Sequence, residues 1–300
     1  MLAYDIKDLV KRYPDQEKPA NSNIALEIHQ GEIFGILGDN GAGKTTLVRQ
    51  MMSLLAPTSG KILLFGRSID EDPLHVAMNV GYMPQQGSGL NNLTVDEILY
   101  FTAHLRGLSR REASIECERL LDIWGIRELH KKMGSALSGG QKQLLQLCTA
   151  MAGSPPVLIL DEPTANLDPR RRKLVWDVLR QTQRTSNSTI IFITHDAIEA
   201  EKAVDRVCIM HKGQVLITGR PSQLKQSVFD KLRLELFFPP DHSPSLPQSV
   251  EHAELRPGHW LIYTDRQNSA ALLSTLNMSE LDDFRLYSAT LEDLYLYYAN

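Results

Sequence analysis

The first part of the chain alternates between short apolar runs and segments of helical periodicity. Residues 24–29 alternate roughly between apolar and polar side chains, which predicts a half-exposed strand. Residues 32–37 form an apolar run that leads into a glycine-rich turn, and this pattern predicts a buried strand. Residues 45–55 have the pattern of a following helix, which the Pro-Thr-Ser-Gly sequence of residues 57–60 ends. A further strand is predicted over residues 61–66.

The middle of the chain, from about residue 90 to residue 134, is helical in character. Thr94 and Glu97 have the spacing of a capping box, and so do Ser109 and Glu112. Each pair precedes a stretch with apolar residues at helical spacing. We therefore expect a helical subdomain over about residues 87–135.

Strands return at residues 157–160 and 189–193. Both runs are short and almost entirely apolar, and each is followed by a helical segment. Such runs are typical of a parallel sheet that is covered on both faces. The pattern therefore predicts an α/β protein.

The pattern loosens around residues 221–229, and a proline-rich joint follows at residues 237–247. The remainder of the chain, to Asn300, has the mixed pattern of a small α+β appendage. We therefore expect one large domain over residues 1–229 and a small accessory domain over residues 230–300.

The composition fits a globular protein with a core, because 42% of its residues are hydrophobic and 23% are charged. No apolar run approaches the roughly 20 residues that span a bilayer, and the first residues lack the pattern of a signal peptide. These features predict a cytoplasmic location. The widely spaced Cys117, Cys148 and Cys208 are expected to be buried thiols rather than a metal site or disulfides.

The charged residues are unevenly spread along the chain. Residues 230–300 carry five basic and eleven acidic side chains, whereas the rest of the chain has a small positive excess. Neither part has the strongly basic character expected of a protein that grips nucleic acid. We therefore expect no nucleic-acid partner.

Residues 38–45, Gly-Asp-Asn-Gly-Ala-Gly-Lys-Thr, match the G-x-x-x-x-G-K-[ST] phosphate-binding loop at every defined position. The loop follows a predicted buried strand and precedes a predicted helix, as the mechanism requires. Its glycines let backbone N–H groups surround phosphates, Lys44 adds a positive charge, and Thr45 offers a hydroxyl to Mg²⁺. Alone, the loop predicts a P-loop NTPase, a class that includes kinases, GTPases and helicases.

Asp161 and Glu162 end the predicted strand over residues 157–160. Asp161 is suited to holding Mg²⁺, and Glu162 to polarising an attacking water beside a γ-phosphate. An ordinary acidic turn after a strand is the competing interpretation of these two residues.

Residues 137–141, Leu-Ser-Gly-Gly-Gln, precede that strand and are the most discriminating segment. Ser138 is expected at the cap of a helix that runs through Gln143, Leu144 and Met151, with backbone N–H groups available to an anion. A plain helix start is the competing interpretation.

In their order along the chain, these motifs resemble the nucleotide-binding subunits of ATP-binding-cassette (ABC) transporters, over about residues 3–229. The resemblance implies an α/β, P-loop NTPase fold of the ABC-cassette type, with a parallel-sheet core, an antiparallel β subdomain and a helical subdomain. The small α+β C-terminal appendage lies outside it. One departure is Leu144, where the family often has a basic residue.

The resemblance also implies roles for individual residues, with ATP and Mg²⁺ as cofactors. The catalytic residues would be Lys44, Gln85, Glu162 and His195. The Mg²⁺ ligands would be Thr45, Gln85 and Asp161. The nucleotide contacts would be Tyr13, Gly38, Asn40, Gly41, Ala42, Gly43, Lys44, Thr45, Thr46, Ser138, Gly139, Gly140, Gln141, Asp161 and Asp168. Gln86 competes with Gln85, and Tyr13 has the alternative of a packed surface tyrosine.

In this family two cassettes meet head to tail, and ATP lies between the phosphate loop of one and the Ser-Gly-Gly segment of the other. The resemblance thus implies a second cassette, as a homodimer or a paralogue, and a separate transmembrane permease that holds the chain at the inner face of the membrane. We expect residues 87–108, including Leu90 and Leu93, to receive a helix of that permease.

The last residues, 286–296, resemble the closing helix of exporter ATPases of the ABC-2 group. The implied function is an ATP-hydrolysing subunit that powers a membrane transporter, with export favoured over import. The alternative is a soluble ABC ATPase that acts on ribosomes or DNA.

Overall fold

The computed structural model describes residues 1–85, 91–228, 232–239, 251–275, 280–288 and 290–299. The chain divides into two compact units, Met1–Gly219 and Arg220–Asn300. This division falls before the expected boundary at residue 229, because helix α8 (Pro221–Val228) packs against helix α10 (Leu291–Ala299) of the second unit. Lys225 Nζ of α8 also donates a hydrogen bond to Ser288 Oγ over 3.1 Å.

The first unit contains a six-stranded sheet whose strand order is β10-β9-β3-β8-β7-β6. Every pair is parallel except the edge pair of β9 and β10. The predicted buried strands are confirmed, since all residues of β3, β7 and β8 are buried. The strands are β3 (Ile33–Leu37), β6 (Val80–Met83), β7 (Val157–Asp161), β8 (Thr189–Thr194), β9 (Arg206–His211) and β10 (Gln214–Gly219).

A second, antiparallel sheet has the order β2-β1-β4-β5, with β1 (Leu2–Lys11), β2 (Asn21–His29), β4 (Ser59–Leu64) and β5 (Arg67–Ser68). Helix α1 (Lys44–Met51) lies against this sheet, and the hydroxyl of Tyr4 donates to the carbonyl of Met51 over 3.1 Å. Helix α1 ends four residues before the predicted end at residue 55. Ser53 has a φ of +54°, a left-handed conformation through which an α-helix does not continue.

The remaining helices of the first unit include both predicted capping boxes. The hydroxyls of Thr94 and Ser109 accept the backbone N–H of Glu97 and Glu112, and each glutamate carboxylate accepts the N–H of its cap residue. The helices are α2 (Pro73–Asn79), α3 (Val95–Leu105), α4 (Arg110–Ile123), α5 (Gly139–Met151), α6 (Pro169–Ser186) and α7 (Ala197–Ala203), with 3₁₀ turns at Arg127–Leu129 and Gly134–Ala136.

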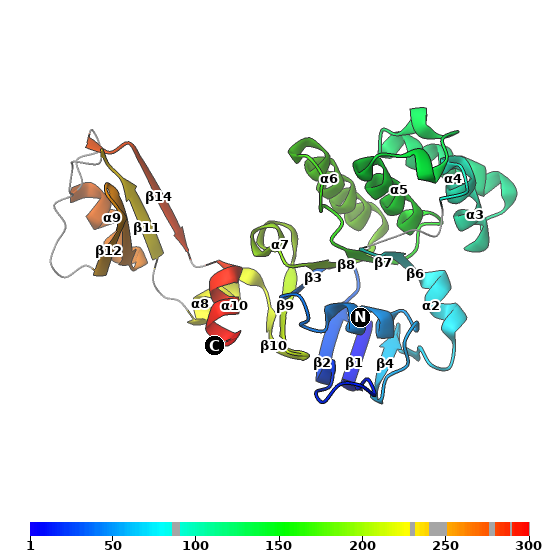
Figure 1. Cartoon of the computed structure of the whole chain (residues 1–300), viewed down its shortest axis with the longest axis horizontal. Coiled ribbons are helices and arrows are strands. Elements are labelled where there is room, and N and C mark those ends of the chain that lie inside the picture. Colours follow the sequence, from blue (N-terminus) through cyan, green and yellow to red (C-terminus); the bar gives the residue numbers. More distant parts are fainter. Residues whose placement is uncertain (86–90, 229–231, 240–250, 276–279, 289, 300) are drawn as a thin grey trace. The chain divides into compact units, whose positions relative to one another are not determined.

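The six-stranded sheet separates two hydrophobic cores. Helices α3 to α6 lie on one side of it and the antiparallel sheet on the other (Figure 1). Alternate residues of β7 pack into different cores, because successive side chains of a strand point to opposite faces. Leu158 and Leu160 pack into the core on the helical side, and Val157 and Ile159 pack into the core that contains Tyr4 and Phe34. The sheet is therefore buried on both faces, and the carboxyl ends of its parallel strands meet at one edge.

The second unit is an antiparallel sheet of the order β12-β13-β11-β14 with helix α9 against it. Its core contains Leu234, Leu236, Phe238, Ile262 and Leu272. Most of the expected proline-rich joint lies outside the described residues. Besides α8 and α10, its elements are β11 (Leu232–Phe237), β12 (Glu251–Arg256), β13 (His259–Thr264), α9 (Arg266–Thr275) and β14 (Asp283–Ser288).

Among the helices within the described ranges, none has the length and apolar character that crossing a bilayer requires. Cys117, Cys148 and Cys208 are buried free thiols, as expected from the sequence.

Candidate nucleotide-binding site

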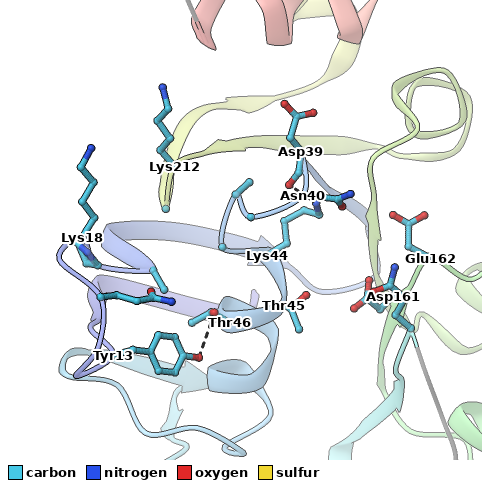
Figure 2. A pocket seen from close by; sticks show the side chains of 18 residues that line it. Tyr13, Lys18, Asp39, Asn40, Lys44, Thr45, Thr46, Asp161, Glu162 and Lys212 are labelled. Atoms are coloured by element: carbon cyan, nitrogen blue, oxygen red, sulfur yellow. Dashed lines mark hydrogen bonds between the residues drawn. The ribbon is translucent and has the colours of Figure 1, made fainter.

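A cavity of about 430 Å³ opens where β3 ends and α1 begins. Figure 2 shows Tyr13 at one end of it, Asp161 and Glu162 at the other, and Lys44 and Thr45 between them. The lining residues are Tyr13, Gln16, Lys18, Pro19, Ala20, Asp39, Asn40, Gly41, Ala42, Gly43, Lys44, Thr45, Thr46, Gln85, Asp161, Glu162, Lys212 and Gly213. The structure therefore brings the phosphate loop, Tyr13, Gln85 and both carboxylates into one space.

The shape of the loop depends on two glycines. A Cβ on Gly38 would lie 2.4 Å from the carbonyl oxygen of Met210, and a Cβ on Gly43 would lie 2.4 Å from that of Ala20. Gly43 also has a φ of +98°, which other residues rarely adopt. Gly38 does not line the cavity. Its lack of a side chain allows the loop after β3 to pass close to the backbone of the neighbouring strand β9.

Lys44 is 9% exposed, and its ammonium donates to the carbonyl oxygens of Gly38 over 2.5 Å and Asp39 over 3.0 Å. Burial lowers the pKa of Lys44, and the carboxylates of Glu162 and Asp161 partly oppose that shift. The loop thus holds a buried positive charge, and such a charge favours the binding of phosphate groups.

Asp161 and Glu162 are 4% and 9% exposed, at the end of β7. Burial raises the pKa of Asp161 to about 6, with a further rise from the charge of Glu162 and an opposing effect of Lys44. Glu162 has a φ of +52°, an uncommon conformation for a residue with a side chain. The carboxylates of an ordinary acidic turn would be solvated, whereas these two are buried.

His195 follows β8 and lies against Glu162. Its backbone N–H donates to Oε1 of Glu162 over 3.0 Å, and its Nδ1 lies 2.6 Å from the same oxygen. The hydroxyl of Thr194 contributes a third hydrogen bond to Oε2, over 3.4 Å. His195 is not a lining residue of the cavity, so its link to the site runs through Glu162.

Tyr13 is half-buried in the cavity wall, and its hydroxyl lies 3.5 Å from Oγ1 of Thr46. The ammonium of Lys11 stands 5.6 Å from the centre of the Tyr13 ring. Gln85 also lines the cavity, whereas its competitor Gln86 lies outside the described residues.

The residues of the Ser-Gly-Gly segment do not line this cavity. Ser138 caps α5, where its hydroxyl accepts the N–H of Gln141 over 3.4 Å and its own N–H donates to Oε1 of Gln141 over 3.0 Å. Ser138 and Gly139 are exposed, and Gly140 and Gln141 are half-buried. Within this chain the segment is thus a capped helix start, and Gln141 serves the cap.

Asp168 is likewise outside the cavity. It caps α6 by accepting the N–H of Arg171 over 2.9 Å, and this hydrogen bond lowers the pKa of its carboxyl. The nucleotide contacts expected of Asp168 and of residues 138–141 are therefore not made by the cavity of the same chain.

Several residues of the site escaped prediction. Lys18 and Lys212 line the cavity on the side opposite Asp161 and Glu162 (Figure 2). The two lysines come from separate turns that are far apart in the sequence, and no local sequence pattern predicts that they line the same cavity. The Nε2 amide group of Gln143 on α5 donates to the carbonyl of Glu162 over 2.9 Å, so the helix that Ser138 caps is bonded to the backbone of Glu162.

The donor set near the loop suits Mg²⁺ only together with a phosphate. Thr45, Gln85 and Asp161 offer a hydroxyl, an amide and one carboxylate, and Mg²⁺ in nucleotide enzymes is held by one or two carboxylates plus substrate phosphates. In the described part of the chain, no group of three or more His, Cys, Asp or Glu side chains is placed to bind a metal by itself.

Comparisons with known proteins give a consistent assignment. A family model described as "ABC transporter" matches residues 21–165. A second model, described as "AAA domain, putative AbiEii toxin, Type IV TA system", matches residues 133–200. The human protein named phospholipid-transporting ATPase ABCA3 is 36% identical over 250 residues, which are 82% of this chain but 15% of that protein. The chain thus spans a small part of the length of the curated relatives it matches.

Two solved structures are similar over most of their own length. One is an ATP-binding subunit of an ABC transporter, with a TM-score of 0.70 and 26% identity over 76% of this chain and 93% of that one. The other is cbiO1 from Clostridium perfringens, part of the ABC transporter complex cbiONQ, with a TM-score of 0.67 over 74% of this chain. Because the likeness to cbiO1 extends over 90% of that subunit at 31% identity, the protein belongs to the ABC transporter family and is an ATP-binding cassette.

Proposed function

We propose that the chain binds ATP with Mg²⁺ in the cavity around the phosphate loop and that Glu162 is the base for its hydrolysis. The observation that carries this proposal is the lining of one cavity by Lys44, Asp161 and Glu162. Phosphoryl transfer depends mainly on positioning and charge neutralisation. A buried ammonium and a carboxylate held by three hydrogen bonds supply both at one end of the cavity.

The other residues have complementary roles in this proposal. Thr45, Gln85 and Asp161 hold Mg²⁺, which neutralises phosphate charge when it is bound. Lys44 binds the terminal phosphates, and the glycines of the loop present backbone N–H groups to them. Tyr13 stacks on the adenine at the far end, about where Figure 2 places its ring. His195 orients Glu162, and its other ring nitrogen, Nε2, contacts the γ-phosphate.

The site is completed by a second copy of the chain. Helix α5 is 13 residues long, and Ser138 and Gly139 at its N-terminus are exposed. This end of the helix does not line the chain's own cavity. Such a helix start is suited to an anion, and the γ-phosphate bound by the second copy provides one. ATP therefore joins two cassettes, and its hydrolysis weakens the contact.

The chain is an ABC ATP-binding subunit of the transporter type, and the proposed transporter part is a separate permease at the inner face of the membrane. Exposed apolar side chains on neighbouring helices support a docking surface for it: Leu74 and Met78 on α2, and Phe101 and Leu105 on α3. Phe101 and Leu105 fall within the expected surface, residues 87–108, whereas Leu93 packs against the helical core. Leu90 lies outside the described residues.

Export is the proposed direction of transport. Two of the similar human proteins are named phospholipid-transporting ATPases, and the end of the chain resembles that of exporter ATPases. A lipid-like cargo is consistent with those names, although the cargo itself would pass through the permease. No observation favours the alternative of an ATPase that acts on ribosomes or DNA.

The assignment of Glu162 is tested by Glu162→Gln. We expect this variant to bind ATP with the affinity of the wild type, because the phosphate loop is untouched, and to lose most of its turnover. Phosphate release and ATP binding by the full chain are measured in parallel. Wild-type turnover in this variant would show that another group is the base.

A further inference from the structure

Two carboxylates connect the segment after β7 with the segment after β8. One carboxylate belongs to the first segment and bonds to the second, and the other belongs to the second and bonds to the first. Glu162, after β7, accepts hydrogen bonds from His195 and Thr194 at the end of β8. Glu199, on α7 after β8, accepts the hydroxyl of Thr164 over 2.6 Å, two residues beyond Glu162. The two strand ends are therefore connected reciprocally, and the proposed base lies in one of the two connections.

Glu199 has a second partner on a third element. Its Oε1 accepts the indole N–H of Trp176 on α6 over 2.7 Å, while Oε2 accepts from Thr164. The Trp176 ring in turn packs edge-on against Phe192 of β8, with ring centroids 4.8 Å apart. Both distances lie at the short end of the range for hydrogen bonds of their kinds.

The position of Glu199 is itself fixed. Asp196, the residue after His195, caps α7 by accepting the N–H of Glu199 over 2.9 Å, so the start of the helix is held next to His195. Glu199 lies one turn later, on the side that faces Thr164 and Trp176. Movement of α7 would thus be transmitted both to His195 and to the segment after Glu162.

The segment after Glu162 depends on such support. Thr164 is 3% exposed, so its hydroxyl would be left without a partner in the protein interior if the Glu199 carboxylate were absent. Glu162 and Asn166, on either side of Thr164, have φ values of +52° and +59°. Side-chain-bearing residues keep this conformation only where their surroundings hold them in it.

We propose that Glu199 is a positioning residue for ATP hydrolysis, which holds Thr164 and thereby the backbone that places the Glu162 carboxylate against the attacking water. The inference rests on the proposed role of Glu162 as base. Glu199 does not line the cavity, so it acts through Thr164 and not on the nucleotide. Glu199 also binds Trp176 of α6, so it connects that helix, which Asp168 caps, to the segment that holds Thr164.

The test compares deletion and conservative variants at both ends of the hydrogen bond. Glu199→Ala and Thr164→Val are expected to lower kcat by up to about 100-fold, because a small displacement of a catalytic group has effects of this size. KM for ATP should stay within about twofold, because the phosphate loop is unaffected. Thr164→Val keeps the shape of the side chain, so it provides a second variant should Glu199→Ala fail to fold.

The conservative variants Glu199→Gln and Thr164→Ser should restore most of kcat. A glutamine oxygen still accepts from Trp176, and its amide donates to the Thr164 hydroxyl, which is able to accept. The matched control is Asp177→Ala on α6, which removes an exposed carboxylate next to Trp176 and should leave kcat unchanged. All variants are assayed as the full chain by phosphate release, ATP binding and thermal unfolding.

Two results would overturn the proposal: kcat near the wild-type value in both deletion variants, or a fall of kcat that is matched by loss of ATP binding and is not restored by the conservative variants. Glu162→Gln is measured alongside. If Glu162→Gln keeps wild-type turnover, the proposed base is wrong. If it loses turnover while Glu199→Ala and Thr164→Val retain it, only the role of Glu199 is wrong.

Discussion

The Oε1 atom of Glu162 lies 2.6 Å from Nδ1 of His195 and also accepts the backbone N–H of His195 over 3.0 Å. A carboxylate only accepts hydrogen bonds, so the proposed role of Glu162 as base requires the proton of the imidazole on Nδ1. The other ring nitrogen, Nε2, is then left for a further contact, and 64% of the His195 side chain is exposed. His195 thus orients Glu162, the proposed base, through Nδ1 and has Nε2 available for a second contact.

His195→Ala is expected to reduce turnover by about 10- to 100-fold, which corresponds to the loss of a hydrogen bond to a charged group. ATP binding should change little, because the contacts of the phosphate loop remain. Phosphate release and ATP affinity of the full chain give the two quantities. Turnover equal to that of the wild type would contradict the assigned position of His195 in the site.

Asp161→Asn is expected to stabilise the fold at neutral pH while removing Mg²⁺-dependent hydrolysis. The pKa of Asp161 is raised to about 6, mainly by burial, so above about pH 6 the folded state carries the charged carboxylate at a cost in stability. In the unfolded chain the carboxyl ionises near pH 4. The folded state therefore loses stability from this group as the pH rises from about 4 to about 6.

Thermal unfolding of both proteins without nucleotide, over pH 4 to 8, measures this effect. The advantage of Asp161→Asn should be full above about pH 6 and should disappear toward about pH 4, where Asp161 is neutral in both states. The exposed Asp177→Asn is the matched control and should show no such difference. A constant advantage of Asp161→Asn across this range would show that its charge is not the cause.

Tyr13→Ala and Tyr13→Phe separate adenine stacking from a packed surface role. Loss of a stacking ring should weaken ATP binding by roughly tenfold or more, whereas phenylalanine keeps the ring and should bind ATP almost as the wild type does. The hydroxyl contact to Thr46 is 3.5 Å long and should contribute little. ATP affinity is measured by calorimetry, and an unchanged value for Tyr13→Ala would favour the surface role.

The sequence predicted the local features of the cassette well because their causes are local. The phosphate loop, the capping boxes at Thr94 and Ser109 and the apolar run over residues 157–160 of β7 each depend on residues that are neighbours in the chain. The end of α1 was predicted too late for the same reason. Leu54 continues the apolar pattern, yet it is 66% exposed beyond a left-handed Ser53.

Features that arise from distant contacts could not be found in this way. Lys212 reaches the cavity from the turn between β9 and β10, and its role depends on the pairing of those strands beside β3. Glu199 looks like an ordinary helical glutamate until Thr164 and Trp176 are brought to it. The place of Ser138 outside its own cavity also follows only from the folded chain.

The central claim is that each ATP site is formed by two copies of the chain, the phosphate loop of one and the Ser138 segment of the other. The molar mass of Glu162→Gln in the presence of ATP and Mg²⁺ tests this claim most directly. Light scattering should give a monomer without nucleotide and a dimer with ATP, because the bound γ-phosphate joins the loop around Lys44 to Ser138 of the second copy. Adding Ser138→Arg, a bulky substitution at an exposed position outside the chain's own cavity, should leave ATP binding intact and abolish the dimer. A Glu162→Gln chain that binds ATP and stays monomeric, or a double variant that still dimerises, would contradict the account.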